Sequence, residues 1–220
     1  MEPQKLIDLS HTIEHGLVTY KGLPAPIICD FLSREASKKV YGEGTTFQIG
    51  KIEMCSNTGT YLDTPFHRYE EGKDLSQIDL DACASLEGVK LVVPESVTAI
   101  DESFFAGLEV RGKALLVQTN WSRHWNTEAY YEGHPHLTEG AARYLRDQGV
   151  RLVGIDTYNI DDIKGKDRPV HTTLLGAEIL IVEHMCNLAV VPASGFKFYA
   201  VPVKIKGFGT FPVRAFAQLN

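Results

Sequence analysis

The chain has 220 residues, and 28 acidic against 22 basic side chains give it a formal net charge of −6 at pH 7. A folded chain of this mass buries roughly 70% of the surface that its extended form exposes, so its core needs neither disulfides nor a stapling metal. With 44% apolar and 23% charged residues, the composition excludes a disordered protein. The acidic balance argues against nucleic-acid binding, and the length favours a single domain over residues 1–220.

The sequence also lacks the signals of a membrane or secreted protein. Its longest apolar runs, such as residues 179–182, are far too short to cross a bilayer, and residues 1–5 do not have the order of a signal peptide. The four cysteines are scattered without a Cys-x-x-Cys pair, which argues against a disulfide framework and a zinc ribbon. We therefore expect a cytoplasmic protein that binds neither membranes nor nucleic acids.

In chain order, the first elements are predicted to be strands. Residues 6–9 predict a short strand, and residues 46–54 alternate as half-buried strands do, with a break at Gly50. Three later apolar runs are short and end at proline, polar or acidic residues, which is typical of buried strands. These runs are residues 90–94, 114–117 and 152–155.

Helices alternate with strands in the second half. A helical pattern covers residues 137–148, with Thr138 as its N-cap and Gly149 just beyond its end. A short helix over 170–175 and a strand over 179–182 follow. The chain is predicted to end with two strands, residues 199–205 and 213–219, around a turn at 207–212. The fold class predicted is α/β, a single layered domain with a mixed β-sheet core and flanking helices.

Reactive side chains are densest in residues 57–68, which read Asn-Thr-Gly-Thr-Tyr-Leu-Asp-Thr-Pro-Phe-His-Arg. In an extended segment, residues an even number apart face the same way, so Asp63 and His67 are expected to converge. Asn57 and Tyr61 would lie on the same side. A surface loop with a capping aspartate and a solvated histidine is the alternative, and the spacing alone does not decide between them.

Two more candidates lie far along the chain. His171 opens the short predicted helix, and Glu183 closes the strand after it. Histidine and carboxylates are usual ligands of zinc and manganese, and such ligands commonly come from distant elements. The alternative is that Glu183 faces water at a strand end and His171 is an ordinary helix residue.

The whole chain resembles the cyclase family of metal-dependent hydrolases, which includes bacterial kynurenine formamidase and isatin hydrolase. The family's pattern His-x-Gly-Thr-His-x-Asp-x-Pro-x-His aligns with residues 57–67, and its late His and Glu match His171 and Glu183 in order and spacing. Further similar segments are residues 8–11, 154–157, 160–161, 202–205 and 212–215. The resemblance implies a cyclase-like (swivelling β/α) fold, and assembly as a homodimer or homotetramer.

The chain departs from the family at two motif positions. Asn57 and Tyr61 stand where the hydrolases have metal-ligating histidines. The resemblance therefore implies one divalent ion, zinc or manganese, held by the four retained residues Asp63, His67, His171 and Glu183. The activity it implies is hydrolysis of a carbon–nitrogen bond in a small amide, formamide or cyclic amide by a metal-activated water.

In this hypothesis, the four metal-binding residues and Tyr61 are catalytic, while Asn57, Tyr61 and Arg68 bind the substrate. Tyr61 and Asn57 would donate hydrogen bonds to the substrate's carbonyl oxygen. A second hypothesis keeps the enzyme without the metal, with Asp63 or Glu183 orienting a histidine as general base. A third is a non-catalytic relative that binds a small molecule.

Overall fold

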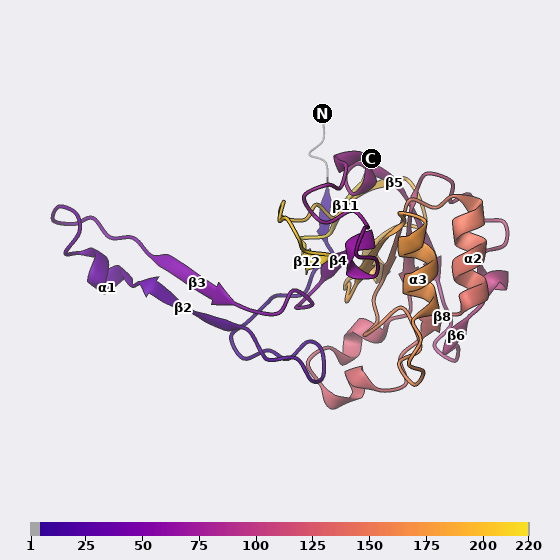
Figure 1. The fold of residues 1–220 in the computed structure, drawn as a ribbon, viewed down its shortest axis with the longest axis horizontal. Coiled ribbons are helices and arrows are strands. Elements are labelled where there is room, and N and C mark those ends of the chain that lie inside the picture. The colour runs from indigo at the N-terminus through magenta and orange to yellow at the C-terminus, as the bar shows by residue number, and fades with distance from the viewer. Residues whose placement is uncertain (1–4, 220) are drawn as a thin grey trace.

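A nine-stranded mixed sheet forms the centre of the molecule (Figure 1). The computed structural model describes residues 5–219; residues 1–4, part of the segment that lacks signal-peptide order, lie outside the described residues. The strands run in the order β1-β13-β11-β5-β7-β9-β10-β4-β12. Strands β5, β7, β9 and β10 pair in parallel, and the remaining pairs are antiparallel. Their bounds are β1 Leu6–Asp8, β4 Tyr61–Asp63, β5 Leu86–Val92, β7 Ala114–Gln118, β9 Leu152–Ile155, β10 Leu180–Glu183, β11 Phe196–Tyr199, β12 Thr210–Pro212 and β13 Phe216–Leu219.

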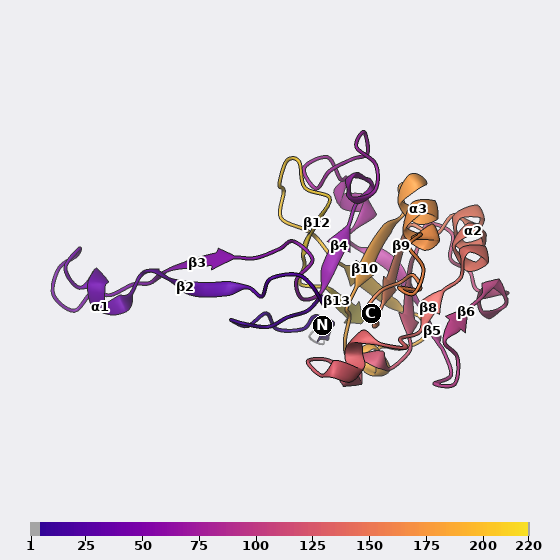
Figure 2. The ribbon, with the colours of Figure 1, turned by 60° about the horizontal axis from the view of Figure 1, so that its bottom comes forward.

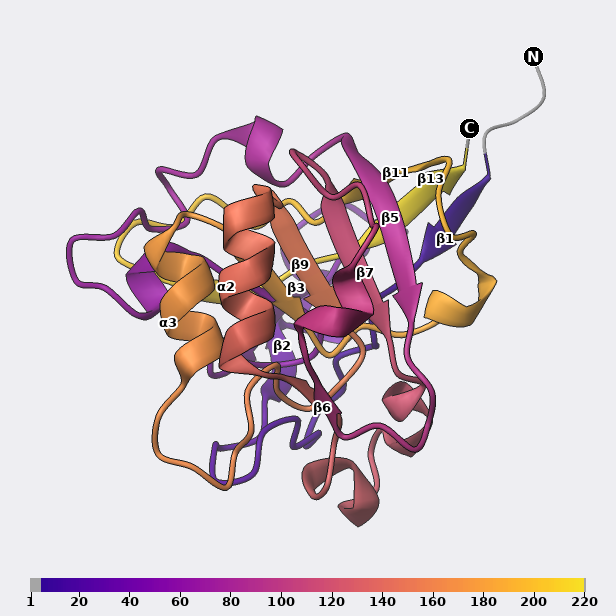
Figure 3. The same cartoon turned by 90° about the vertical axis from the view of Figure 1, so that its right-hand side faces the viewer.

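The central strands send alternate side chains into two apolar layers. Leu115 and Val117 of β7 pack in one cluster with residues of helices α2 (Glu139–Gln148) and α3 (Pro169–Gly176). Leu116 joins the cluster on the other side, which includes the phenylalanines of β11. Both helices cover one face of the sheet (Figure 3). This arrangement confirms the predicted α/β class with a mixed sheet and flanking helices.

The caps of α2 explain where that helix begins and ends. The Thr138 hydroxyl accepts a hydrogen bond from the Ala141 N–H at 3.1 Å, as an N-cap does. Gly149 ends the helix with a φ of 74°, a conformation that favours glycine. None of the helices in residues 5–219 is long and apolar enough to cross a membrane.

Shorter elements complete the described chain. Strands β6 (Ala99–Ile100) and β8 (His136–Leu137) pair in parallel apart from the main sheet. Single turns of 3₁₀ helix connect the larger elements. They are η1 Pro65–His67, η2 Leu80–Ala82, η3 Glu102–Phe105, η4 Trp121–His124, η5 Glu128–Tyr131 and η6 Leu188–Val190.

A hairpin arm projects from this body (Figures 1 and 2). It consists of antiparallel strands β2 (Ile27–Leu32) and β3 (Ile49–Glu53), with the short helix α1 (Arg34–Ser37) towards its tip. The prediction of half-buried strands over 46–54 is wrong, because every residue of β3 is exposed and no second layer lies against the arm. Gly50 does not break the strand and pairs with Asp30.

The end of the chain also differs from the prediction. Strand β11 ends at Tyr199, so the predicted strand over 199–205 is wrong, and the predicted turn contains β12. The alternating segment after Tyr199 leaves Val201 and Val203 exposed, which shows that its pattern does not mark a buried face. Strand β12 is only three residues long and forms through pairing with β4, a contact that local sequence does not reveal.

Gly88 allows β5 and β11 to approach each other. A Cβ atom added at Gly88 would lie 1.9 Å from Cε2 of the fully buried Phe196, so Gly88→Ala should lower the free energy of unfolding by about 1–3 kcal/mol. Gly50→Ala is the matched control, because nothing lies within 4 Å of its added Cβ. Denaturant unfolding of both variants measures the difference, and equal stabilities would contradict the packing described.

Candidate active site

The pairing of β4 with β10 brings the first candidate residues together. In this antiparallel pair Tyr61 lies opposite Glu183, and Asp63 lies opposite Ile181. Tyr61 and Asp63 are two residues apart on one strand and therefore face the same side of the sheet. All three predicted residues, Tyr61, Asp63 and Glu183, are almost completely buried, with exposed fractions of 1% or less.

Asp63 and His67 converge, as predicted, but through a turn and not an extended strand. The 3₁₀ turn η1 places His67 Nδ1 3.6 Å from Asp63 Oδ1. Thr210 of β12 bridges them: its Oγ1 donates to Asp63 Oδ1 and lies 2.8 Å from His67 Nδ1. A hydroxyl has one proton, so His67 Nδ1 must be the donor to Thr210. With its proton on Nδ1, a neutral imidazole has its lone pair on Nε2.

Asp161 positions His171. Its carboxylate accepts hydrogen bonds from the backbone N–H groups of Val170 and His171 at the start of α3, and lies 2.6 Å from His171 Nδ1. This contact holds a proton on Nδ1 and turns Nε2 towards the other acids. Nε2 lies 3.7 Å from both Asp63 Oδ2 and Glu183 Oε1.

Tyr61 and Glu183 form a buried phenol–carboxyl pair. The Tyr61 hydroxyl donates to Glu183 Oε2 at 2.7 Å, and the Ile160 N–H donates to Oε1 at 2.6 Å. Burial and the charges of Glu183 and Asp63 raise the pKa of Tyr61 well above its ordinary value. Tyr61 is therefore a neutral phenol, and its proton points to Glu183. Its predicted role as a donor to substrate stays a prediction.

The pKa values of the site depend on three carboxyl groups that surround the imidazole of His171. Burial lowers the pKa of His171, but the carboxyls of Glu183, Asp161 and Asp63 outweigh this effect and raise it to about 10. Burial raises the pKa of Glu183 to about 7, with a further contribution from Asp63. For Asp63, burial is outweighed by His67 and His171, and its pKa falls below the ordinary value.

The residues present fit a divalent cation. One ligand atom from each of Asp63, His67 and His171 lies within 4.8 Å of the others, and Asp63 Oδ2 is buried without a hydrogen-bond partner among residues 5–219. Both imidazoles keep Nε2 free of hydrogen-bonded partners in that part of the chain. Three such ligands with an open position are typical of catalytic zinc. Glu183 lies beside this group with both oxygens already hydrogen-bonded, so its place in a four-ligand set stays a prediction.

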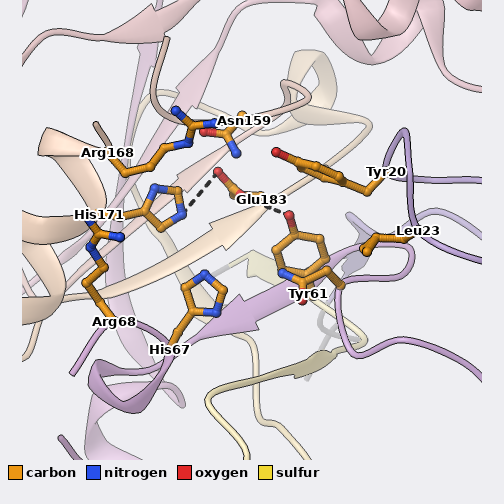
Figure 4. A pocket seen from close by; sticks show the side chains of 10 residues that line it. Tyr20, Leu23, Tyr61, His67, Arg68, Asn159, Arg168, His171 and Glu183 are labelled. Atoms are coloured by element: carbon orange, nitrogen blue, oxygen red, sulfur yellow. Dashed lines mark hydrogen bonds and ion pairs between the residues drawn. The ribbon is translucent and has the colours of Figure 1, made fainter. Parts of the chain in front are cut away.

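A cavity of about 260 Å³ opens onto this cluster (Figure 4). The residues predicted to bind substrate, Asn57, Tyr61 and Arg68, all lie in its wall. Their contacts with substrate stay predictions. His67, His171 and Glu183 complete the reactive side.

Sequence reasoning missed several residues of the site. Asp161 is too far before α3 to form a capping pattern, since the residue at the N-cap position is Arg168, and only the family-like segment 160–161 pointed to it. Thr210 carries no signal, since it lies 147 residues from Asp63 and reaches it through the β4–β12 pair. The other missed wall residues are Tyr20, Leu23, Asn159 and Arg168.

Comparison with known proteins gives consistent matches over the chain. The model of the cyclase family, described as "Putative cyclase", matches residues 7–162. Kynurenine formamidases of Bacillus cereus and Bacillus anthracis are each 28% identical, over 216 and 217 residues and 98% of both chains. A solved structure described as a potential metal-dependent hydrolase with cyclase activity is 26% identical, with a TM-score of 0.81 over 99% of both chains. Isatin hydrolase A from Labrenzia aggregata, 22% identical, shares the fold with a TM-score of 0.82 over 98% of this chain and 94% of its own.

The pH dependence of stability in the metal-free protein should report on His171. Its pKa is about 10 in the folded protein, against 6.5 for an ordinary histidine. The folded chain therefore binds one more proton than the unfolded chain between these values, and the free energy of unfolding should fall as pH rises through this window. Asp161→Asn removes one of the acids that raise the pKa of His171 in the folded protein. The decrease in the free energy of unfolding should therefore end at a lower pH in this variant. Denaturant unfolding of chelator-treated protein measures both curves, and curves of identical shape would contradict the assignment.

Proposed function

Because the chain belongs to the cyclase family, we propose that it is a hydrolase that cleaves a carbon–nitrogen bond in a small amide, formamide or cyclic amide. The observation that carries this proposal is the Asp63–His67–His171 cluster: His67 and His171 line the cavity, and one oxygen of the fully buried Asp63 has no hydrogen-bond partner among residues 5–219. The similarity to kynurenine formamidases supports formamides as the first substrates to test.

Asp63, His67 and His171 would hold the ion, zinc or manganese, with Glu183 beside them. When bound, such a cation lowers the pKa of a water molecule and polarises the scissile carbonyl. Asp161 keeps the proton on His171 Nδ1, so that Nε2 faces the cluster. Thr210 does the same for His67 through its hydroxyl.

Glu183 is the group in this site best suited to move a proton. In the metal-free chain, burial raises the pKa of this carboxyl to about 7, which makes it a stronger base than an exposed glutamate. The Tyr61 hydroxyl fixes Oε2, and Oε1 faces His171 Nε2. We assign to Glu183 the transfer of a proton from water to the leaving nitrogen. Asn57, with its amide in the cavity wall, would donate to the substrate carbonyl.

The remaining expectations are proposals about where and with what the protein works. We propose a cytoplasmic enzyme acting on a small molecule, with neither nucleic acid nor membrane as a partner. The four cysteines are free thiols, which supports a reducing compartment. Two apolar layers that share one sheet support a single domain over residues 1–220.

We also propose that the chain assembles as a homodimer or homotetramer through the hairpin arm. An isolated two-stranded hairpin is marginally stable in water, and this one exposes large apolar side chains. Phe31 is 76% exposed, Tyr41 60% and Ile52 58%. In a homo-oligomer, a second copy of the chain would cover these apolar side chains.

Metal analysis and turnover test the proposed function together. Protein purified without a metal-binding tag should contain about one equivalent of zinc or manganese, because Asp63, His67 and His171 supply one set of three ligands. Asp63→Asn removes the unpartnered ligand and should lose the ion and at least about a hundredfold in formamide hydrolysis. Asp162→Asn, which changes an exposed carboxylate nearby, should keep both.

Other outcomes distinguish the alternatives. Turnover that survives exhaustive chelation would favour the metal-free acid–histidine mechanism. Tight binding of a carbonyl compound without turnover in the metal-loaded protein would favour the non-catalytic relative.

Sedimentation equilibrium tests the role of the arm. The wild-type chain should have a mass of two or four times 24.4 kDa. Ile52→Asp places a charge on the exposed arm and should weaken assembly, whereas Val203→Asp, at a residue that is 57% exposed on the body, should not. A wild-type mass of one chain at micromolar concentration would overturn this proposal.

A further inference from the structure

The residue that follows Glu183 has an unusual backbone conformation. His184 comes directly after strand β10 and has a φ of 55°, in the left-handed region that residues with a Cβ atom seldom adopt. The non-glycine residues of 5–219 with a positive φ are Ser85, Asn120, Asn126, Glu178, His184 and Asn187. His184 alone among them is fully buried, whereas the others are exposed or half-buried. A non-glycine residue keeps this conformation only where its surroundings fix it, and such residues are typical of functional sites.

This conformation lets two consecutive residues reach the same tyrosine. In a regular strand, neighbouring side chains point to opposite faces. Here the Glu183 carboxyl accepts a hydrogen bond from the Tyr61 hydroxyl at 2.7 Å, a contact that a dashed line marks in Figure 4. The imidazole of His184 packs against the ring of Tyr61, with ring centroids 5.0 Å apart. Glu183 therefore holds the hydroxyl of Tyr61, and His184 supports its ring.

Both backbone polar groups of His184 are hydrogen-bonded. Its N–H donates to the carbonyl oxygen of Thr157 at 3.3 Å. Its carbonyl oxygen accepts from the hydroxyl of Thr60 at 2.6 Å. Thr60 directly precedes Tyr61, the first residue of β4, and Thr157 follows shortly after β9. The turn after Glu183 is therefore fixed to the segments on both sides of β10.

Aromatic side chains surround the imidazole of His184. Its Nδ1 lies 3.0 Å from the Tyr130 hydroxyl. The ring centroids of Trp125, Tyr130 and Tyr158 lie 5.6 to 5.9 Å from that of His184, as expected for aromatic rings in contact. His184 is not among the described residues that line the cavity, so its influence on a bound molecule must pass through its neighbours.

We infer that His184 is a positioning residue that holds the Tyr61 phenol on the Glu183 carboxyl. This inference rests on the proposed function, in which Glu183 moves a proton. The hydrogen bond from Tyr61 occupies Oε2 of Glu183, and Oε1 faces His171 Nε2. Without the imidazole behind it, the ring of Tyr61 has room to move, and Glu183 loses the contact that fixes its orientation. A displacement of about 1 Å in a catalytic group can lower a rate about a hundredfold.

Two variants disturb this support in different ways. Tyr130→Phe removes the hydroxyl that lies against Nδ1 and keeps all the rings. His184→Asn keeps a residue type that tolerates a positive φ, and removes the ring behind Tyr61. Each variant should lower kcat for formamide hydrolysis by the metal-loaded protein about tenfold or more, because Glu183 is less well oriented. KM should stay within about threefold of the wild-type value, because neither residue lines the cavity.

Tyr199→Phe is the matched control. It also removes a phenolic hydroxyl, which donates to Gln218 Oε1 at 2.9 Å. That hydrogen bond joins β11 to β13, and the strand order separates both from β10 and β4. This variant should keep the wild-type kcat and KM.

The ¹³C resonance of the Tyr61 Cζ atom reports on the same support without turnover. This carbon bears the hydroxyl, so its chemical shift responds to the hydrogen bond that the phenol donates. In protein labelled at the Cζ atoms of its nine tyrosines, Tyr61→Phe identifies the resonance. Tyr130→Phe and His184→Asn should both move it, and Tyr199→Phe should not. A loss of stability alone lowers the amount of folded protein and leaves the chemical shift of the folded state unchanged.

Together the two measurements separate the positioning role from the proposed function. If no formamide is hydrolysed but the Tyr61 resonance moves in Tyr130→Phe and His184→Asn and not in Tyr199→Phe, the proposed function fails and the positioning role holds. If formamides are hydrolysed, a wild-type kcat in either folded variant would overturn the inference and leave the function intact. An unmoved Tyr61 resonance in either folded variant would overturn it as well. Should His184→Asn fail to fold, Tyr130→Phe decides alone.

Discussion

The site depends on the burial of the Asp63 carboxylate. A charge with no exposed surface must be compensated, and here the compensation comes from the turn that follows Asp63 and from two distant parts of the chain. Thr210 donates to one oxygen, and His67 and His171 face the carboxylate from two sides. Because the other oxygen, 3.7 Å from His171 Nε2, has no hydrogen-bond partner among residues 5–219, the fold leaves a place for a cation or a donor. The surrounding strands and turns serve to hold this arrangement.

Close backbone contacts hold the turn that carries His67 in place. A Cβ at Gly209 would lie 2.3 Å from the backbone nitrogen of His67, so the residue just before β12 lies directly against the backbone of the 3₁₀ turn. The Thr64 N–H donates to the Gly209 carbonyl at 2.8 Å, which ties the same two segments together. A side chain at this position would displace His67, and the geometry of the cluster would change with it. The start of the edge strand thus supports the site twice, through Thr210 and through Gly209 just before it.

The structure accommodates the two residues, Tyr61 and Asn57, that stand in place of histidines of the family pattern. Tyr61 occupies a buried position opposite Glu183 in the β4–β10 pair, where a phenol can satisfy one carboxyl oxygen without a metal. Burial and the charges of Glu183 and Asp63 raise the pKa of Tyr61 well above its ordinary value, so the side chain in the metal-free chain is a neutral phenol. Asn57 lies close enough for its amide to affect the phenol.

Sequence patterns predicted the elements that are formed locally. The helix with Thr138 and Gly149 and the buried run at β7 follow from caps and hydrophobicity, which neighbouring residues determine. The proximity of His171 to Asp63 was suggested only by the family resemblance, since no local pattern connects α3 to β4. Strand β12 and the exposed arm were not predicted, because one depends on a distant partner strand and the other has regular alternation without a buried face.

The segments at the two ends of the hairpin arm also form part of the cavity wall. Tyr20 and Leu23 lie in the segment that leads into β2, and Asn57 follows closely after β3, so both ends of the arm enter the cavity wall. A two-stranded hairpin fixes its two ends relative to each other only as well as the hairpin itself is held. Contacts that order the arm would therefore also order the aromatic wall and Asn57. The proposed assembly through the arm would therefore connect oligomeric state to the order of this part of the cavity wall.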